Sequence, residues 1–291
     1  MEQDELPLGI VGEAESSRVG GPAVVEGVPV GIAAGPTVRL RLLIGYLGTH
    51  FHGLAPQPGL RTVVGQLGDA LAKIVGLAEA PHFAMSGRTD AGVHGWGQVL
   101  HVDIPIPRKG LNVERMAKSL NSMTGTEIAI RELDVVPKEF HARYSAKSRS
   151  YRYTILNRPL PDPFLTRTVW HVPEPLDVRL LRLACDPFLG EHDFTSFCRA
   201  PIVGDGEAPR SLIRLITFAD WVELGDGILR LDITGQSFCQ QMVRSIVAMM
   251  VEIGRGRRTA GDIIPMLLSK DRTYAPRVAP AHGLCLWEVG Y

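Results

Sequence analysis

One acidic residue lies in a segment that contains too much glycine to form a helix. The stretch "SGRTDAGVHGWGQVLH" at residues 86–101 has four glycines and contains Asp90. Gly87 and Gly92 allow backbone angles that a side chain forbids, so we expect a loop between two strands. Such a loop can present the Asp90 carboxylate at the end of a sheet. The simpler alternative is an Asx-turn, in which the carboxylate only caps its own backbone.

Several catalytic arrangements that need more than one group do not fit the same segment. A zinc deaminase needs HxE followed by PCxxC, but Gly95 and Trp96 follow His94 and the chain has no CxxC. The chain also lacks a GxxxxGK[ST] phosphate loop and a GxSxG nucleophile elbow. His94 and His101 are expected to pack or to form hydrogen bonds rather than to share a metal. One carboxylate without a metal or an acidic partner remains.

Composition predicts a globular protein of the cytoplasm. The 291 residues are 45% hydrophobic, which is enough to bury a core, and no apolar run approaches the roughly 18 residues of a membrane span. The start "MEQDELPLGI" is acidic where a signal peptide is basic. The four cysteines are scattered singly, which fits a reducing compartment and argues against a structural zinc.

Charge is distributed unevenly along the chain. Residues 1–37 hold six acids and one base, so the rest of this formally neutral chain carries about +5. Residues 138–158 contain six Lys or Arg and one Glu, interleaved with Tyr144, Tyr151 and Tyr153. Three more bases lie in "GRGRR" at 254–258. Such stretches can track phosphates and stack on bases, although a solvated strand with paired charges has the same composition.

The pattern of apolar residues predicts two similar halves after a flexible extension at residues 1–37. In the first half we expect strands at 39–48, 81–87, 97–104 and 127–136, with helices at 62–76 and 112–123. This order is the split βαβ arrangement of ferredoxin-like folds. The second half repeats it loosely, with strands at 150–156, 212–224, 227–234 and 283–291, and helices at 176–190, 238–254 and 260–269.

These elements predict an α/β (α+β) fold. Two ferredoxin/RRM-like halves form a mixed, largely antiparallel sheet flanked by helices, with a central basic cleft between them. The N-terminal half, residues 38–136, carries the GRTDAGVH motif. The C-terminal half, residues 137–291, carries the basic strand and the "MVR" helix.

The segment around Asp90 also resembles the signature of a known family. "GRTDAGVHGWGQVLH" is similar to the motif of the tRNA pseudouridine synthase A family. Four later blocks resemble those of the family and follow in its order, namely "FHARYSAKSRSYRYTILN", "LGEHDFTSFC", "SFCQQMVRSIVAMMVEIG" and "LSKDRTYAPRVAPAHGLCLWEV". The resemblance covers residues 39–291.

The resemblance implies a site and a reaction. Asp90 matches the catalytic aspartate, Arg244 the arginine paired with it, and Tyr151 the tyrosine that stacks on the target base. Arg88 matches the arginine that opens the RNA. The family isomerises uridine to pseudouridine at positions 38, 39 and 40 of the tRNA anticodon stem-loop. It does so as a homodimer, without a cofactor or a metal.

That chemistry makes demands that the residues can meet. The reaction needs an ionised carboxylate at the ribose, which either attacks C1′ or removes a proton; the sequence leaves both open. A carboxylate in a dry pocket needs a cationic partner, and Arg244 stands among apolar residues that favour a position facing a polar cleft. Everting a uridine costs a few kcal/mol, which stacking on Tyr151 and phosphate contacts can offset. The candidate phosphate contacts are Arg143, Lys147, Arg149 and Arg152.

The chain departs from the family pattern at one place. The first strand of the family usually ends in Tyr-Asp-Gly and continues to Trp-Gln, whereas "GYLGTHFHGLAPQ" has Leu47 instead of the acid and Leu54-Ala55-Pro56 instead of the aromatic residue. This difference bears on RNA contacts and substrate range. Two alternatives stay open: a catalytically inactive RNA-binding relative, and a pseudouridine synthase that acts on another RNA.

Overall fold

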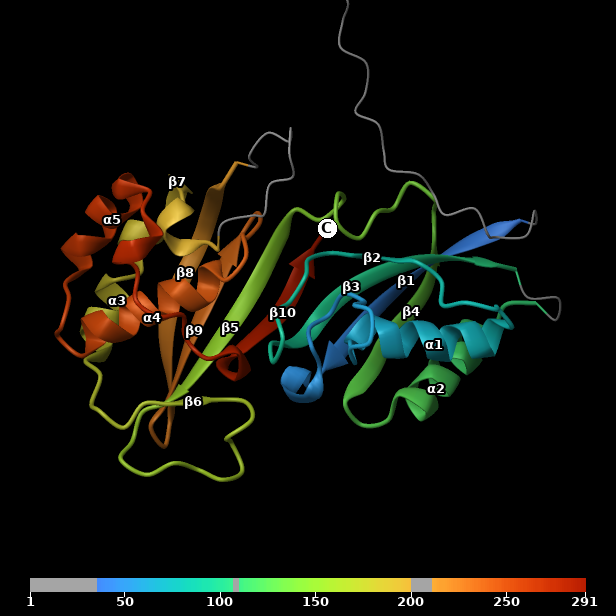
Figure 1. Cartoon of the computed structure of the whole chain (residues 1–291), viewed down its shortest axis with the longest axis horizontal. Coiled ribbons are helices and arrows are strands. Elements are labelled where there is room, and N and C mark those ends of the chain that lie inside the picture. Colours follow the sequence, from blue (N-terminus) through green and yellow to red (C-terminus); the bar gives the residue numbers. More distant parts are fainter. Residues whose placement is uncertain (1–35, 107–109, 200–210) are drawn as a thin grey trace, which may run out of the picture. The chain divides into compact units, whose positions relative to one another are not determined.

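The computed structural model describes residues 36–106, 110–199 and 211–291 (Figure 1). The predicted flexible extension at 1–37 lies, except for its last two residues, outside the described residues. None of the described helices has both the length and the apolar character that a bilayer crossing requires.

The first half has the predicted order of elements. They are β1 (Thr37–Tyr46), α1 (Val63–Val75), β2 (Phe83–Met85), β3 (His94–Pro105), α2 (Val113–Thr124) and β4 (Ile128–Val136). Local signals explain the helix ends: the Thr62 side chain accepts from the Gly65 amide, and Gly76 ends α1 in the left-handed conformation. Asn112 caps α2 in the same way as Thr62 caps α1.

The second half contains more strands than predicted. Its elements are β5 (Ser148–Leu156), β6 (Trp170–His171), α3 (Val178–Leu183), β7 (Gly190–Asp193), β8 (Ile213–Gly225), β9 (Ile228–Gly235), α4 (Met242–Gly254), α5 (Ile263–Ser269) and β10 (Leu284–Gly290). The helix predicted at 176–190 is too long, because the chain turns into a 3₁₀ segment at 186–188 that contains a proline. The helix predicted at 238–254 begins only at Met242, because Gln241 has a left-handed backbone.

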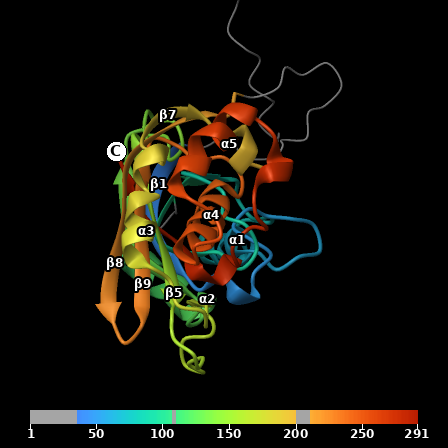
Figure 2. The ribbon, with the colours of Figure 1, turned by 90° about the vertical axis from the view of Figure 1, so that its left-hand side faces the viewer.

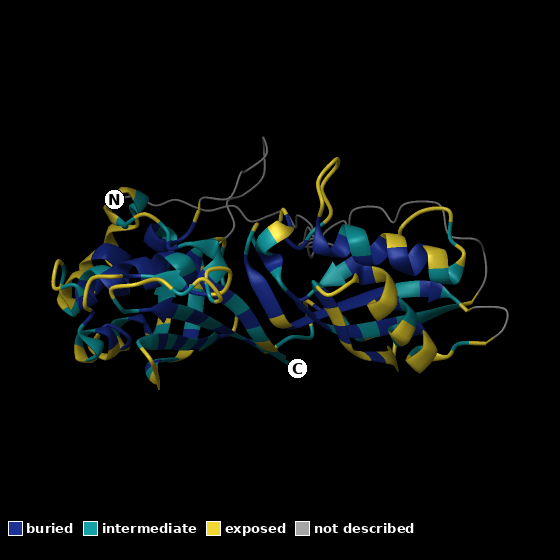
Figure 3. Ribbon diagram, turned by 90° about the horizontal axis from the view of Figure 1, so that it is seen from below, coloured by how far each residue is buried: buried dark blue, intermediate teal, exposed yellow. Residues whose placement is uncertain are grey.

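All the strands belong to one mixed sheet. Its order is β4-β1-β3-β10-β5-β9-β8-β7, with β2 paired to β3 and β6 paired to β5. Helices α1 and α4 lie on the same side of the strands (Figure 2). Many residues of the helices and strands are buried, and exposed residues are frequent in the loops (Figure 3). The predicted α/β class with a large helix-flanked sheet is confirmed.

The C-terminal strand joins the two halves. β10 runs parallel to β3, pairing Cys285 with His94, and antiparallel to β5, pairing Leu286 with Tyr151. Each half has its own cluster of buried apolar residues, one under α1 and α2 and one under α4. Gly97 of β3 lies so close to β10 that a Cβ would overlap the Trp287 carbonyl oxygen. The seam between the halves therefore depends on a residue without a side chain.

We expect Gly97→Ala to weaken this seam. The added methyl group meets backbone, which cannot rotate away, so the free energy of unfolding should fall by about 1–3 kcal/mol. Urea denaturation followed by circular dichroism measures the change. Gly261→Ala is the control, because a Cβ there makes only ordinary contacts. Equal stability of the two variants would contradict the close approach.

Candidate active site

The Asp90 loop connects β2 to β3, as predicted. The backbone turns at Asp90, whose carbonyl accepts from the Val93 amide at 3.2 Å. The carboxylate does not cap this turn. Its hydrogen bonds among the described residues go to the other half of the chain, to Gln240 Nε2 at Oδ1 and to Arg244 Nη1 at Oδ2, each 3.4 Å long. The Asx-turn alternative does not describe this geometry.

Arg244 lies in the first turn of α4 and is held from behind. Its Nε donates to the Ala279 carbonyl at 2.7 Å, which leaves Nη1 free to face Asp90. The Arg244 and Asp90 side chains are 14% and 29% exposed, so water screens their attraction only in part. The two residues are 154 positions apart, so their contact joins the two halves of the chain at the Asp90 carboxylate.

The end of β1 and the connection that follows it support the Asp90 loop at Thr89. The Tyr46 hydroxyl hydrogen bonds with the Thr89 hydroxyl at 2.8 Å, and the Leu54 amide donates to the Thr89 carbonyl at 3.2 Å. Gly53 has φ of 98°, and a Cβ there would come within 2.9 Å of the Thr89 carbonyl oxygen. The segment in which the sequence departs from the family pattern thus packs directly against the residue before Asp90.

Tyr151 faces the same region from β5. Its side chain is buried, with 9% of the residue exposed, and its ring meets Phe238 edge to face at 5.0 Å. Burial raises the pKa of Tyr151 to about 12, and the nearby Asp90 carboxylate adds to the rise, so the phenol is neutral at physiological pH. Tyr153, two residues on, is completely buried and donates to the Pro280 carbonyl. Tyr153 is therefore a core residue.

The other predicted contacts are spread over different surfaces. Arg88 and Arg143 are exposed, and the Arg143 guanidinium lies 5.6 Å from the ring of Tyr144, which is 76% exposed. Arg152 points to the opposite face of β5. There it forms an ion pair with Asp232 at 3.2 Å and stacks on Trp287 at 3.6 Å. The structure brings Asp90, Arg244 and Tyr151 together, but not Arg152.

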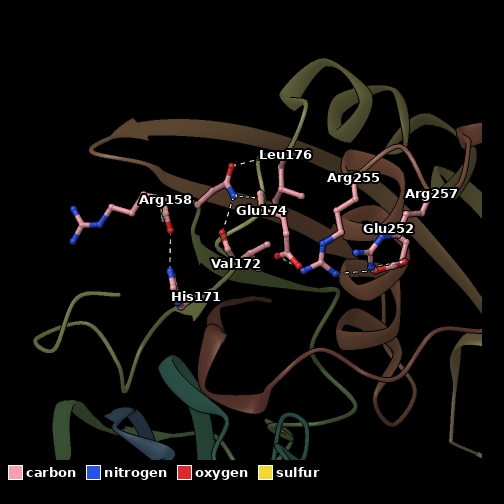
Figure 4. Close-up of polar contacts among 9 residues, drawn as sticks. Arg158, His171, Val172, Glu174, Leu176, Glu252, Arg255 and Arg257 are labelled. Carbon is pink, nitrogen blue, oxygen red and sulfur yellow. Dashed lines mark hydrogen bonds and ion pairs between the residues drawn. The ribbon is translucent and has the colours of Figure 1, made fainter. Parts of the chain in front are cut away.

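Two groups of predicted phosphate contacts have other partners. The prediction for Arg149 is wrong, because its guanidinium is buried and donates to backbone carbonyls. In the 254–258 segment, Arg255 pairs with Glu174 and Glu252, and Arg257 also meets Glu252 (Figure 4). Glu174 and Glu252 therefore offset part of the positive charge of this segment, which the sequence pattern predicted to face RNA. The nearby connection between β5 and β6, residues 157–169, is held at its ends by a hydrogen bond between the His171 ring and the Arg158 carbonyl (Figure 4).

Two of the cysteines, expected to be single, lie close together. Cys198 and Cys239 lie side by side with their Cα atoms 5.9 Å apart, while Cys185 and Cys285 have no cysteine neighbour among the described residues. The pair is 41 residues apart in sequence, and no local spacing announces it. Cys239 directly precedes Gln240, a contact of Asp90 that the sequence analysis missed. Gln240 lies four residues before Arg244, and this spacing could have indicated that both side chains face Asp90.

The two histidines of the motif form hydrogen bonds, as predicted. His94 Nδ1 accepts from the Gly48 amide at 2.9 Å, and Nε2 lies near two backbone carbonyls. His101 Nδ1 accepts from the Ala142 amide at 3.0 Å, which holds the loop that contains Arg143. Burial lowers the pKa of His101 to about 4. Within the described ranges, no cluster of three or more His, Cys, Asp or Glu could hold a metal.

Comparison with known proteins identifies the family. The tRNA pseudouridine synthase A of Bacillus licheniformis is 37% identical over 254 residues, which are 87% of this chain and 99% of that protein. The one of Bacillus subtilis is 38% identical over the same shares. This chain belongs to the tRNA pseudouridine synthase A family. The family model described as tRNA pseudouridine synthase matches residues 184–291. Among solved structures, one titled as a Cbf5-Nop10-Gar1 complex aligns over 72% of this chain and 45% of that chain, at 13% identity and a TM-score of 0.30.

The His101 geometry of this family member predicts a pH dependence of stability. The pKa is lower in the folded chain than in the unfolded one, so the neutral ring stabilises the fold above about pH 6.5, and this stability is lost as the pH falls toward about 4. Protonation of Nδ1 also removes the acceptor for Ala142. His101→Asn keeps an acceptor but does not titrate. Between about pH 6.5 and about pH 4, the free energy of unfolding of this variant should fall by on the order of 2 kcal/mol less than that of the wild type. Parallel pH curves in urea denaturation would refute this role.

Proposed function

We propose that the protein isomerises uridine to pseudouridine at positions 38, 39 and 40 of the tRNA anticodon stem-loop, with Asp90 acting at the ribose. Family membership carries the coarser part of this statement: the chain is a tRNA pseudouridine synthase, an isomerase. The observation that supports the finer part is the contact between Asp90 and Arg244 across the two halves.

The reaction conserves all atoms of the substrate. The bond from C1′ to N1 breaks, the uracil turns, and C5 bonds to C1′ while the C5 proton is transferred to N1 through solvent. No oxidant, reductant or cofactor is consumed. Asp90 serves as an ionised carboxylate at the ribose, either by attack on C1′ or by removal of a ribose proton. Arg244 keeps this charge in place, since a carboxylate without a cation would be costly to bury beside a base.

The target base must leave its stack to reach Asp90. Tyr151 offers its ring at this point, and stacking on an aromatic ring offsets part of the few kcal/mol that eversion costs. Arg88, exposed in the Asp90 loop itself, and Arg143, exposed in the loop before β5, serve as phosphate contacts at a central basic cleft. Arg152, on the other face of β5, can contact only a different part of the RNA or a partner protein.

The same proposal includes two domains, a homodimer and a cytoplasmic location. The domains are 38–136 and 137–291, and transfer RNA is a cytoplasmic substrate. The sheet face opposite α1 and α4 carries exposed Trp96 and Phe218, and Trp96 stacks on Trp287 with ring centroids 6.0 Å apart. Exposed tryptophan and phenylalanine on one face of a sheet favour contact with a second copy of the chain.

Asp90→Asn tests the catalytic assignment. Tritium at C5 of uridine in tRNA is released to water when C5 bonds to C1′, so the rate of release measures the reaction. We expect the substitution to lower this rate by a factor on the order of 10³ or more, because the amide cannot supply the charge. The dissociation constant for tRNA should change by less than about threefold, because Asp90 contacts no phosphate.

The control is Asp69→Asn, which removes an exposed acid of α1. Release by Asp90→Asn at the wild-type rate would refute the catalytic role. A wild-type protein that binds tRNA but releases no tritium would favour the inactive relative. A wild-type protein whose product lies outside positions 38–40 would favour a different RNA target.

Trp96→Glu tests the homodimer. A charge placed on the sheet face should be costly to bury between two copies and should shift the protein toward the monomer in sedimentation velocity runs at micromolar concentration. Phe164→Glu is the matched control, since Phe164 is almost fully exposed on the 157–169 connection. A wild-type monomer, or a dimer unaffected by Trp96→Glu, would refute this interface.

A further inference from the structure

Arg149 is a buried arginine whose hydrogen bonds all go to the backbone. Only 9% of the residue is exposed, and burial lowers its pKa. Nη1 donates to the carbonyls of Gln236 at 2.8 Å and Ala146 at 3.3 Å, and Nη2 to those of Ser86 and Arg143, both at 2.9 Å. None of these acceptors is a carboxylate. A charged group is rarely buried in this way without a role that its position explains.

The acceptors belong to three segments that border the active site. Ser86 begins the loop that carries Asp90. Gln236 begins the connection from β9 to α4, which contains Gln240 and leads to Arg244. Arg143 and Ala146 lie in the loop that presents Tyr144. One planar guanidinium is therefore bonded to Ser86 and to Gln236. Ser86 begins the segment that leads to Asp90, and Gln236 begins the segment that leads to Arg244, so the guanidinium fixes the distance between the two segments.

The strand that carries Arg149 also aligns it with the stacking tyrosine. Arg149 and Tyr151 are two positions apart on β5, so both side chains point to the same face. The direct contacts of Asp90 with Gln240 and Arg244 are long, at 3.4 Å, and cannot set this spacing firmly by themselves. The shorter bonds from Arg149 to Ser86 and Gln236 can do so.

We propose that Arg149 is a positioning residue for the isomerisation: it clamps the Asp90 loop, the entry to α4 and the Tyr144 loop at the spacing that the reaction requires. This inference rests on the proposed function. It differs from a phosphate contact, because the guanidinium is occupied by carbonyls. It also differs from a general contribution to folding, because its effect should fall on the rate of the chemical step.

Arg149→Met and Arg149→Lys test the proposal. Methionine keeps an unbranched apolar stem but makes no hydrogen bonds, and lysine keeps the charge but cannot span carbonyls on several segments as a planar guanidinium does. The matched control is Arg214→Met, since Arg214 also has its pKa lowered by burial and donates to carbonyls, which among the described residues are those of Ser211 and Ile213 in its own segment. All rates are measured in single turnover with saturating tRNA, at a temperature where circular dichroism shows each variant fully folded.

We expect both Arg149 variants to lose about tenfold to 100-fold in the single-turnover rate, since small displacements of reacting groups have effects of this size. The dissociation constant for tRNA should stay within about threefold of the wild type, and Arg214→Met should keep the wild-type rate within about twofold. A wild-type rate for Arg149→Met would overturn the inference. So would full activity of Arg149→Lys, or a loss confined to tRNA affinity. Absence of pseudouridine with the wild type would instead overturn the proposed function.

Discussion

The attraction between one carboxylate and one guanidinium from opposite halves of the chain is the constraint on which the site depends. Asp90 stands on a loop between two strands of the first half, and Arg244 on the first turn of a buried helix of the second. Each group depends on the other: the partly buried Asp90 carboxylate needs a cation beside it, and the Arg244 guanidinium in α4 is oriented by that anion. The fold has to bring them within reach and keep them there.

Several features of the fold serve this one contact. β10 joins the sheets of the two halves, and Gly97 lets its backbone come close to β3. Thr89 is held by Tyr46 and Leu54, so the loop cannot swing away from its sheet. Arg244 is anchored on the Ala279 carbonyl. Arg149 donates to the carbonyl of Ser86, where the Asp90 loop begins, and to that of Gln236, where the connection to α4 begins. Thr89, Ser86 and Gln236 are therefore each hydrogen bonded to a residue of β1 or β5, and Arg244 is bonded to the backbone before β10.

Local sequence signals predicted the parts of this structure that local interactions determine. The helices predicted at 62–76 and 112–123 form almost as expected, with their first residues, Thr62 and Asn112, as N-caps, and the glycines around Asp90 form the expected loop. Long-range contacts were harder to predict. The close approach of Cys198 and Cys239 has no local signature, and a buried Arg149 looks the same in sequence as an exposed arginine in a basic stretch. The resemblance to the family supplied the Asp90–Arg244 pairing, which spacing alone could not.

The most direct test of the central claim is the single-turnover rate of Arg244→Met at saturating tRNA, compared with that of Arg244→Lys. If the guanidinium holds the Asp90 carboxylate in place, methionine should lower the rate by a factor on the order of 10² to 10³, and lysine, which retains the charge, should restore part of it. The tRNA dissociation constant should remain nearly unchanged in both. A rate for Arg244→Met within about threefold of the wild type would contradict the account.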